Sequence, residues 1–165
     1  MYKASSSIMM TIGVMTLALF NQVQAGWNWG WCPEVATKSS FNLDQYLGVW
    51  HEQKRDKSIL YEYGECIQAG YSRRSDGLIN VHNSQFVTSS NKVNDVKGTA
   101  ECNGSKCKVG FFLFRDGDYQ IVDTDYTNYS VVYSCATVLF FFRYETTWAL
   151  TRSTTPSASI VSTYD

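Results

Sequence analysis

The sequence lacks most of the features on which common functional assignments depend. It has only two prolines and two histidines, and its formal net charge is −1 over 165 residues. Neither a basic patch nor an acidic tail appears, so we expect no nucleic-acid partner and no strongly charged membrane partner. A serine-centred elbow, a Walker loop and a Rossmann glycine pattern are all absent. No motif therefore assigns the chain to an enzyme class.

Metal ligands are also scarce. His51 and His82 stand far apart and have no neighbours at metal-ligand spacing. Four aspartates between positions 116 and 125 invite a calcium interpretation, but their spacing does not match a calcium loop. Aspartate is common in turns, which explains them without a metal. We expect neither a metal nor a cofactor.

One long apolar run is present, at the N-terminus. It spans positions 8–20, follows Lys3, and precedes the small-x-small sequence Val23-Gln24-Ala25. This pattern predicts a secretory signal peptide over residues 1–25, because the run is too short to span a bilayer. An uncleaved membrane anchor is the alternative. The rest of the chain has no second such run, so we expect a secreted protein without a membrane span.

Aromatic residues are abundant, at 15% of the chain. Together with many Val and Thr residues, they favour β-structure around an aromatic-lined space. Alternating segments separated by turn signals, such as Asp76-Gly77, predict eight antiparallel strands in an up-and-down barrel. The strands are expected to begin at Trp50 and then to cover 65–72, 78–83, 96–102, 108–114, 119–122, 129–137 and 144–152. A turn is expected at 116–118. A barrel of this size can hold one small ligand.

Three stretches carry a resemblance to a known family. The pattern from Asn42 through Gly48 and Trp50 to Glu52 resembles the first signature of the lipocalins. Residues 124–135 resemble the second signature, and residues 148–152 resemble the third. Cys32-Pro33 and residues 65–69 are similar to apolipoprotein D and to its arthropod bilin- and carotenoid-binding relatives. The resemblance covers residues 32–152.

The resemblance implies an all-β calyx over residues 26–152 that carries a small hydrophobic ligand and is not an enzyme. It implies that Arg152 lies across Trp50 at the barrel floor, a cation–π contact. The signature residues are Gly48, Trp50, Thr124, Asp125, Tyr126 and Arg152. In the family, the first inter-strand loop covers the open mouth, where Ile59, Leu60, Tyr61 and Tyr63 would supply apolar surface. The aromatic arm 26–31 is expected to pack over the closed end, or else to contact a ligand or partner.

The inward-facing residues follow from strand alternation, with Trp50 and Trp148 taken as inward, and from the apolipoprotein D-like pattern. The expected ligand-binding residues are Ile67, Ala69, Tyr71, Ile79, Val81, Asn83, Tyr119, Ile121 and Trp148. Asn83, Tyr71 and Tyr119 could fix a carbonyl or hydroxyl group of the ligand. Alternatively, some of these side chains simply fill the core, and a slip of one residue would turn the whole set outward.

Five cysteines follow the predicted signal peptide. In a secreted chain they are read first as disulfides, and one must be left over. The resemblance implies a Cys32–Cys135 pair, and the short loop between Cys102 and Cys107 is suited to a local pair. Cys66 is then left as a free thiol, as a cysteine paired between chains, or as the nucleophile of a lipocalin-type isomerase.

Two sequons, at Asn103 and Asn128, are candidate glycosylation sites in expected turns.

The C-terminal tail departs from the family pattern. Residues 153–165 are short and rich in Ser and Thr, so they cannot supply the long amphipathic helix that lipocalins pack outside the barrel. The family's later cysteine partner for Cys66 is absent, and His51 stands where Tyr is usual. The uncovered face would be exposed, or covered by a second copy or a protein partner.

Three functions therefore remain open: a carrier of a lipid, sterol, retinoid, bilin or carotenoid, an isomerase that uses Cys66, and a protein-binding scaffold with a collapsed cavity. The apolar and aromatic character of the expected inner wall favours the carrier.

Overall fold

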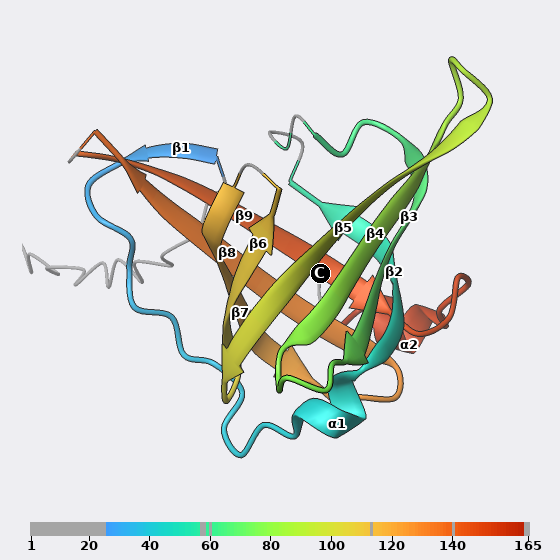
Figure 1. Ribbon diagram of the computed structural model, residues 1–165, viewed down its shortest axis with the longest axis horizontal. Coiled ribbons are helices and arrows are strands. Elements are labelled where there is room, and N and C mark those ends of the chain that lie inside the picture. The colour runs from blue at the N-terminus through green and yellow to red at the C-terminus, as the bar shows by residue number, and fades with distance from the viewer. Residues whose placement is uncertain (1–25, 57–58, 60, 113, 140, 164–165) are drawn as a thin grey trace, which may run out of the picture.

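The computed structural model describes residues 26–56, 59, 61–112, 114–139 and 141–163, so the predicted signal peptide lies outside the described residues. Eight antiparallel strands form a closed barrel, in which β9 pairs with both β8 and β2 (Figure 1). The strands are β2 (Gly48–Arg55), β3 (Glu65–Arg73), β4 (Ile79–Val87), β5 (Lys92–Asn103), β6 (Lys106–Phe111), β7 (Phe114–Thr124), β8 (Tyr129–Val138) and β9 (Phe142–Thr151). The predicted fold class is confirmed.

A ninth strand, β1 (Gly26–Trp29), pairs with residues 142–145 of β9, beyond the end of β2. It therefore lies at the end of the barrel opposite the short helix α1 (Leu43–Tyr46), as Figure 1 shows. The expectation that this arm covers the closed end is wrong. The reason is that β9 extends past β2 and leaves an unpaired backbone edge, which Gly26–Trp29 occupies.

The closed end begins with α1, whose first turn is capped by Asn42. The Asn42 side chain accepts a hydrogen bond from the Gln45 backbone N–H at 3.2 Å. The chain then turns at Gly48 with φ of 101°, a backbone conformation that favours glycine. This turn places Trp50 at the floor with no exposed surface, and its Nε1 donates to the Tyr46 carbonyl at 2.9 Å.

Arg152 covers this floor from outside. Its guanidinium lies 3.7 Å from the centre of the Trp50 ring, which confirms the expected cation–π contact. Five backbone carbonyls accept hydrogen bonds from it, those of Gln45, Tyr46, Leu47, Val49 and Tyr126. A Cβ on Gly48 would lie 3.1 Å from Arg152 Nη1, so glycine also provides the space for the guanidinium.

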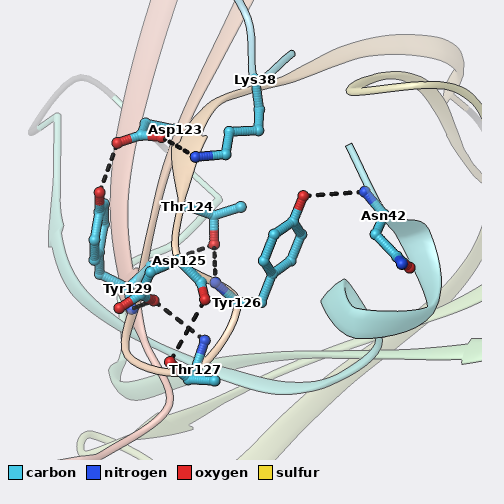
Figure 2. A network of polar contacts seen from close by, with 8 residues as sticks. All are labelled: Lys38, Asn42, Asp123, Thr124, Asp125, Tyr126, Thr127 and Tyr129. Atoms are coloured by element: carbon cyan, nitrogen blue, oxygen red, sulfur yellow. Dashed lines mark hydrogen bonds and ion pairs between the residues drawn. The ribbon is translucent and has the colours of Figure 1, made fainter. Parts of the chain in front are cut away.

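The second signature forms the turn between β7 and β8 (Figure 2). Thr124 Oγ1 accepts from the Tyr126 N–H at 2.9 Å and donates to the Tyr129 carbonyl at 2.6 Å. The Asp125 carboxylate accepts from the backbone N–H groups of residues 127, 128 and 129. These contacts lock the turn, and Tyr126 then accepts from the Asn42 N–H at 3.0 Å, which ties the turn to α1.

Two disulfides are present, Cys32–Cys135 and Cys102–Cys107, as expected. Cys66 is free and exposed. It has a left-handed backbone conformation, with φ of 51°, at an irregularity in the β3–β4 pairing.

One detail differs from expectation. Residues 116–118 lie inside β7 and are not a turn, because Gly117 and Asp118 pair with Val109 and Lys108 of β6. Beyond the barrel, the described tail forms only the four-residue helix α2 (Ala158–Val161), consistent with the expected truncation of the C-terminal helix.

We expect Arg152→Ala to lower the free energy of unfolding by about 3 kcal/mol, because it removes the cation–π contact and leaves several carbonyls without their donor. Arg152→Lys should restore only part of this loss, since an ammonium cannot form the same planar fork. Urea unfolding followed by tryptophan fluorescence measures both. Arg74→Ala, which removes an exposed Arg74–Asp76 pair, is the control and should have little effect. An equally small loss for Arg152→Ala would contradict the role given to this clamp.

The two disulfides should contribute unequally, because they close loops of different length. Their sequence separations are 103 for Cys32–Cys135 and 5 for Cys102–Cys107. Replacing each pair by alanines should cost about 5 kcal/mol for the first and about 2 kcal/mol for the second on chain-entropy grounds. Urea unfolding of the two double variants tests this. Equal losses would show that loop length does not determine the difference.

Candidate ligand-binding site

The lower half of the barrel is filled by hydrogen-bonded phenols. Tyr119 Oη lies 3.0 Å from both Tyr46 Oη and Tyr71 Oη, and Tyr46 Oη lies 3.1 Å from Ser130 Oγ. Burial raises the pKa of Tyr46 to about 12 and also raises the pKa of Tyr71 and Tyr119. The phenols are therefore neutral at physiological pH. They form a polar platform above Trp50, which packs against Tyr46 with ring centroids 5.1 Å apart.

The nine residues expected to bind ligand lie on the inner side of the barrel. The register sets Ala69 opposite both Trp50 and Asn83, and Tyr71 opposite Val81. Six of the nine fall into two groups. Ile79, Val81 and Ile121 are fully packed in the core, as the alternative interpretation anticipated, whereas Tyr71, Tyr119 and Trp148 are partly buried and pack against it. Ile67 is buried, and Ala69 and Asn83 are partly buried. Contact with ligand stays a prediction for all nine.

The side-chain oxygens of Asn83 and Gln120 are buried and accept no hydrogen bond from the described residues, and Asn83 is the one of the two that is a predicted ligand anchor. Neighbouring inward positions carry apolar groups, such as Ala69 across the β3–β4 pair. A buried amide oxygen without a donor is costly, and a ligand donor could satisfy it. Of the predicted anchors, Asn83 therefore has the clearest unmet hydrogen-bonding capacity.

The upper half contains an open cavity of about 590 Å³, lined by Glu52, Gln53, Lys54, Arg55, Ile59, Glu62 and Tyr63. None of the nine expected ligand-binding residues lines this cavity. Of the four residues expected at the entrance, Ile59 is only 5% exposed, whereas Tyr61 and Tyr63 are exposed, and Leu60 lies outside the described residues.

Several charged side chains line this cavity together because of an irregularity in β2. The pairing with β9 shifts between Glu52 and Lys54, so that Glu52 lies opposite Leu150 and Arg55 opposite Trp148. Such a bulge lets two residues three positions apart face the same side of the sheet. Arg55 Nη1 donates to Glu52 Oε1 at 2.5 Å, and the Glu52 side chain is only 5% exposed.

Glu62 reaches the same group from the loop that precedes β3. Its Oε2 accepts a hydrogen bond from Trp148 Nε1 at 2.9 Å, and its carboxyl lies close enough to that of Glu52 for each to shift the pKa of the other. Two neighbouring carboxyls can hydrogen-bond to each other only when one of them holds a proton. Burial, reinforced by the neighbouring Glu52 and opposed by Trp148 and Arg55, raises the pKa of Glu62 to about 7.

Glu52, Arg55 and Glu62 are not among the residues expected to bind ligand, and Glu52 is part of the prediction only as the end of the first signature. Glu52 could have been found, since it lies two residues after Trp50 and so on the same face of the strand. The inward position of Arg55 depends on the bulge in β2, and the position of Glu62 depends on the path of a loop. Strand alternation encodes neither feature, so neither residue could have been found from it.

The rim of the barrel near β1 is aromatic. Trp29 packs on Phe142 with centroids 4.3 Å apart, and Trp27 on Tyr144 at 5.1 Å. Both tryptophans stay largely exposed. The two predicted glycosylation positions, Asn103 and Asn128, are exposed as well, and their occupancy stays a prediction.

The raised pKa of Glu62 makes stability depend on pH. Between the ordinary glutamate value of 4.5 and about 7, the folded protein holds this proton while the unfolded chain has lost it. Its contribution is therefore complete below pH 4.5 and is lost as pH rises through about 7. We expect the melting temperature of the wild type to fall relative to that of Glu62→Gln from about pH 5 to about pH 8. If the melting temperatures of the two proteins changed equally between these pH values, the raised pKa of Glu62 would be contradicted.

The helices of the described part of the chain, α1 and α2, are four residues long each, far shorter than a bilayer-spanning helix.

Known solved structures share this architecture. Lobster apocrustacyanin A1 superposes with a TM-score of 0.71 at 18% identity, covering 86% of this chain and 82% of that chain. Insecticyanin from the tobacco hornworm Manduca sexta gives a TM-score of 0.71 at 20% identity, covering 85% of this chain and 78% of that chain. At these identities the likeness establishes the fold alone.

Sequence comparison gives the family. Residues 41–164 match the family model of the lipocalin-like domain. Apolipoprotein D of Bos taurus is 34% identical over 75% of this chain and 67% of the relative, and that of Mus musculus is 35% identical over 88% and 80%. The Lazarillo protein of Schistocerca americana is 36% identical over 63% of this chain and 51% of the relative. The chain therefore belongs to the lipocalin family and is similar to apolipoprotein D.

Proposed function

We propose that this lipocalin is a secreted carrier that binds one small hydrophobic molecule reversibly inside its barrel. Lipid, sterol, retinoid, bilin and carotenoid all suit such an interior. The observation that carries the proposal is the buried Asn83 oxygen, which has no donor among the described residues although it lies in a largely apolar wall. Family membership supports the same function.

Binding would draw on two physical terms. Burial of apolar ligand surface contributes about 25 cal/mol per Å² and supplies most of the affinity. Asn83 supplies orientation, because a ligand hydroxyl that donates to Oδ1 would remove the cost of an unpaired buried acceptor, about 1–3 kcal/mol. The phenol platform below limits how deeply the ligand can enter.

The position of Cys66 supports a carrier over an isomerase. A nucleophile for a ligand held in the barrel must reach the interior, whereas Cys66 is exposed at the start of β3. The two disulfides support secretion, since such bonds persist in oxidising compartments. A second copy or a protein partner over the face left uncovered by the short α2 stays a prediction.

Tryptophan fluorescence of the folded chain, titrated with members of the five ligand classes, tests the carrier function. Trp50 at the floor and Trp148 in the wall should report binding. We expect saturable quenching by at least one class. No response to any class from a folded monomer would reject the proposal.

Asn83→Leu should weaken binding of a hydroxyl-bearing ligand about tenfold, since it removes one hydrogen bond to the ligand. Asn80→Leu is a matched control, because Asn80 lies on the same strand and is exposed. Equal affinities for the two variants would show that Asn83 does not anchor the ligand.

A further inference from the structure

The cavity at the barrel mouth has an unusual charge balance. Glu52 and Glu62 both face it, whereas Arg55 is the cation that bonds to this pair. Lys54 also lines the cavity, but it is exposed and pairs with Ala149, so it lies on the other face of the strand from Arg55, which pairs with Trp148. Arg55 thus balances one carboxylate, and the raised pKa of Glu62 lets a proton neutralise the other below about pH 7.

The surroundings of the pair are aromatic and uncharged. Trp148 donates to Glu62 from β9, and Tyr71 of β3 lies near enough for Glu62 to raise the pKa of its phenol. The pKa of the Tyr61 phenol is raised by burial and also by Glu62, Tyr144 and Glu52, so Tyr61 lies near the carboxyl pair. Among the described residues, Arg55 is the cation that bonds to Glu52, so a second positive charge could come from a ligand.

We propose that Glu52 and Glu62 form a binding subsite for the ammonium group of an amphipathic amine, whose apolar tail extends into the barrel. This inference rests on the proposed carrier function and adds the chemical class of the ligand head group. The subsite matches an ammonium group in three respects: it requires a single positive charge, it offers carboxyl oxygens as acceptors, and aromatic rings border it.

An ammonium satisfies these requirements in a way that other cations do not. Its N–H donors can bond to the Glu52 and Glu62 oxygens that Arg55 and Trp148 leave available, and its charge is favourable beside the Trp148 ring. A calcium ion prefers six to eight oxygen ligands, more than two carboxyls supply. Among the described residues, no group of three metal-binding side chains occurs.

Binding of the amine exchanges one positive charge for another. The protonated amine enters, Glu62 loses its proton to solvent, and the ammonium bonds to both carboxylates. The net charge of the subsite is the same before and after, which avoids the cost of burying an unpaired charge. The exchange becomes easier as pH rises, because the empty site then holds its proton less firmly.

Three ligands with one alkyl chain separate the head-group effect from apolar burial: octylamine, 1-octanol and octanoate. Tryptophan fluorescence at about pH 6 and about pH 8 gives their affinities. A site that must first lose a proton with a pKa of about 7 should bind octylamine about tenfold more tightly at the higher pH. The affinity for 1-octanol should not rise with it, and octanoate should bind more weakly at the higher pH. Calorimetry at about pH 6 in buffers of different ionisation enthalpy should show about one proton released per octylamine bound.

Glu62→Gln provides the decisive variant. Glutamine keeps an acceptor for Trp148 and mimics the protonated carboxyl, but it cannot become an anion. The ratio of octylamine to 1-octanol affinity at about pH 8 should fall about tenfold, and its pH dependence should disappear. Glu65→Gln, an exposed change at the start of β3, is the matched control and should behave as wild type.

The possible failures are distinguishable. Binding of 1-octanol with no preference for octylamine, or a preference that survives in Glu62→Gln, would overturn this inference and leave the carrier function intact. Failure of all three octyl ligands and of the wider ligand panel in a folded chain would overturn both.

Discussion

The contact between Arg152 and Trp50 is the constraint on which the rest of the barrel depends. Arg152 directly follows β9, and Trp50 lies on β2, the two strands whose pairing closes the sheet. The guanidinium also holds the carbonyls of α1 and of the β7–β8 turn. One side chain therefore joins the first and last barrel strands, the helix below them and the second signature. Gly48 makes this possible because it lacks a Cβ where the guanidinium lies.

A sealed floor determines where a ligand can be accommodated. Above Trp50, the phenols of Tyr46, Tyr71 and Tyr119 satisfy one another and fill the lower interior. Space remains toward the mouth, between the bulged end of β2 and the loop that carries Glu62. The polar groups available to a ligand are the buried Asn83 oxygen, which has no donor among the described residues, and the carboxyl pair at the mouth. The apolar surface that would supply affinity and the polar anchors that would supply selectivity thus lie in different parts of the interior.

The fold could be predicted from sequence because its signals are local. Alternation fixed the inward set, and the signatures identified Trp50 and Arg152 as partners 102 positions apart. The failures involve pairings that a local pattern does not encode. Asp116-Gly117-Asp118 reads as a turn, yet β6 supplies partners that extend β7 through it. The arm at Trp27 was misplaced because its position depends on how far β9 extends past β2. Arg55 faces inward only because of a bulge.

A carboxyl pair inside a carrier is costly unless it does more than fill space. Two hydrophobic residues at positions 52 and 62 would bury as much surface without a charge, a bulge or a proton. Stability alone therefore does not explain Glu52 and Glu62. Because the pKa of Glu62 is raised to about 7, one proton can neutralise the carboxyl that Arg55 does not balance at lower pH, and that proton stays replaceable. A neutral polar anchor such as Asn83 cannot do this, because it distinguishes hydrogen-bonding groups but not charges. The pair thus gives the barrel a means to discriminate between ligands whose apolar parts are the same.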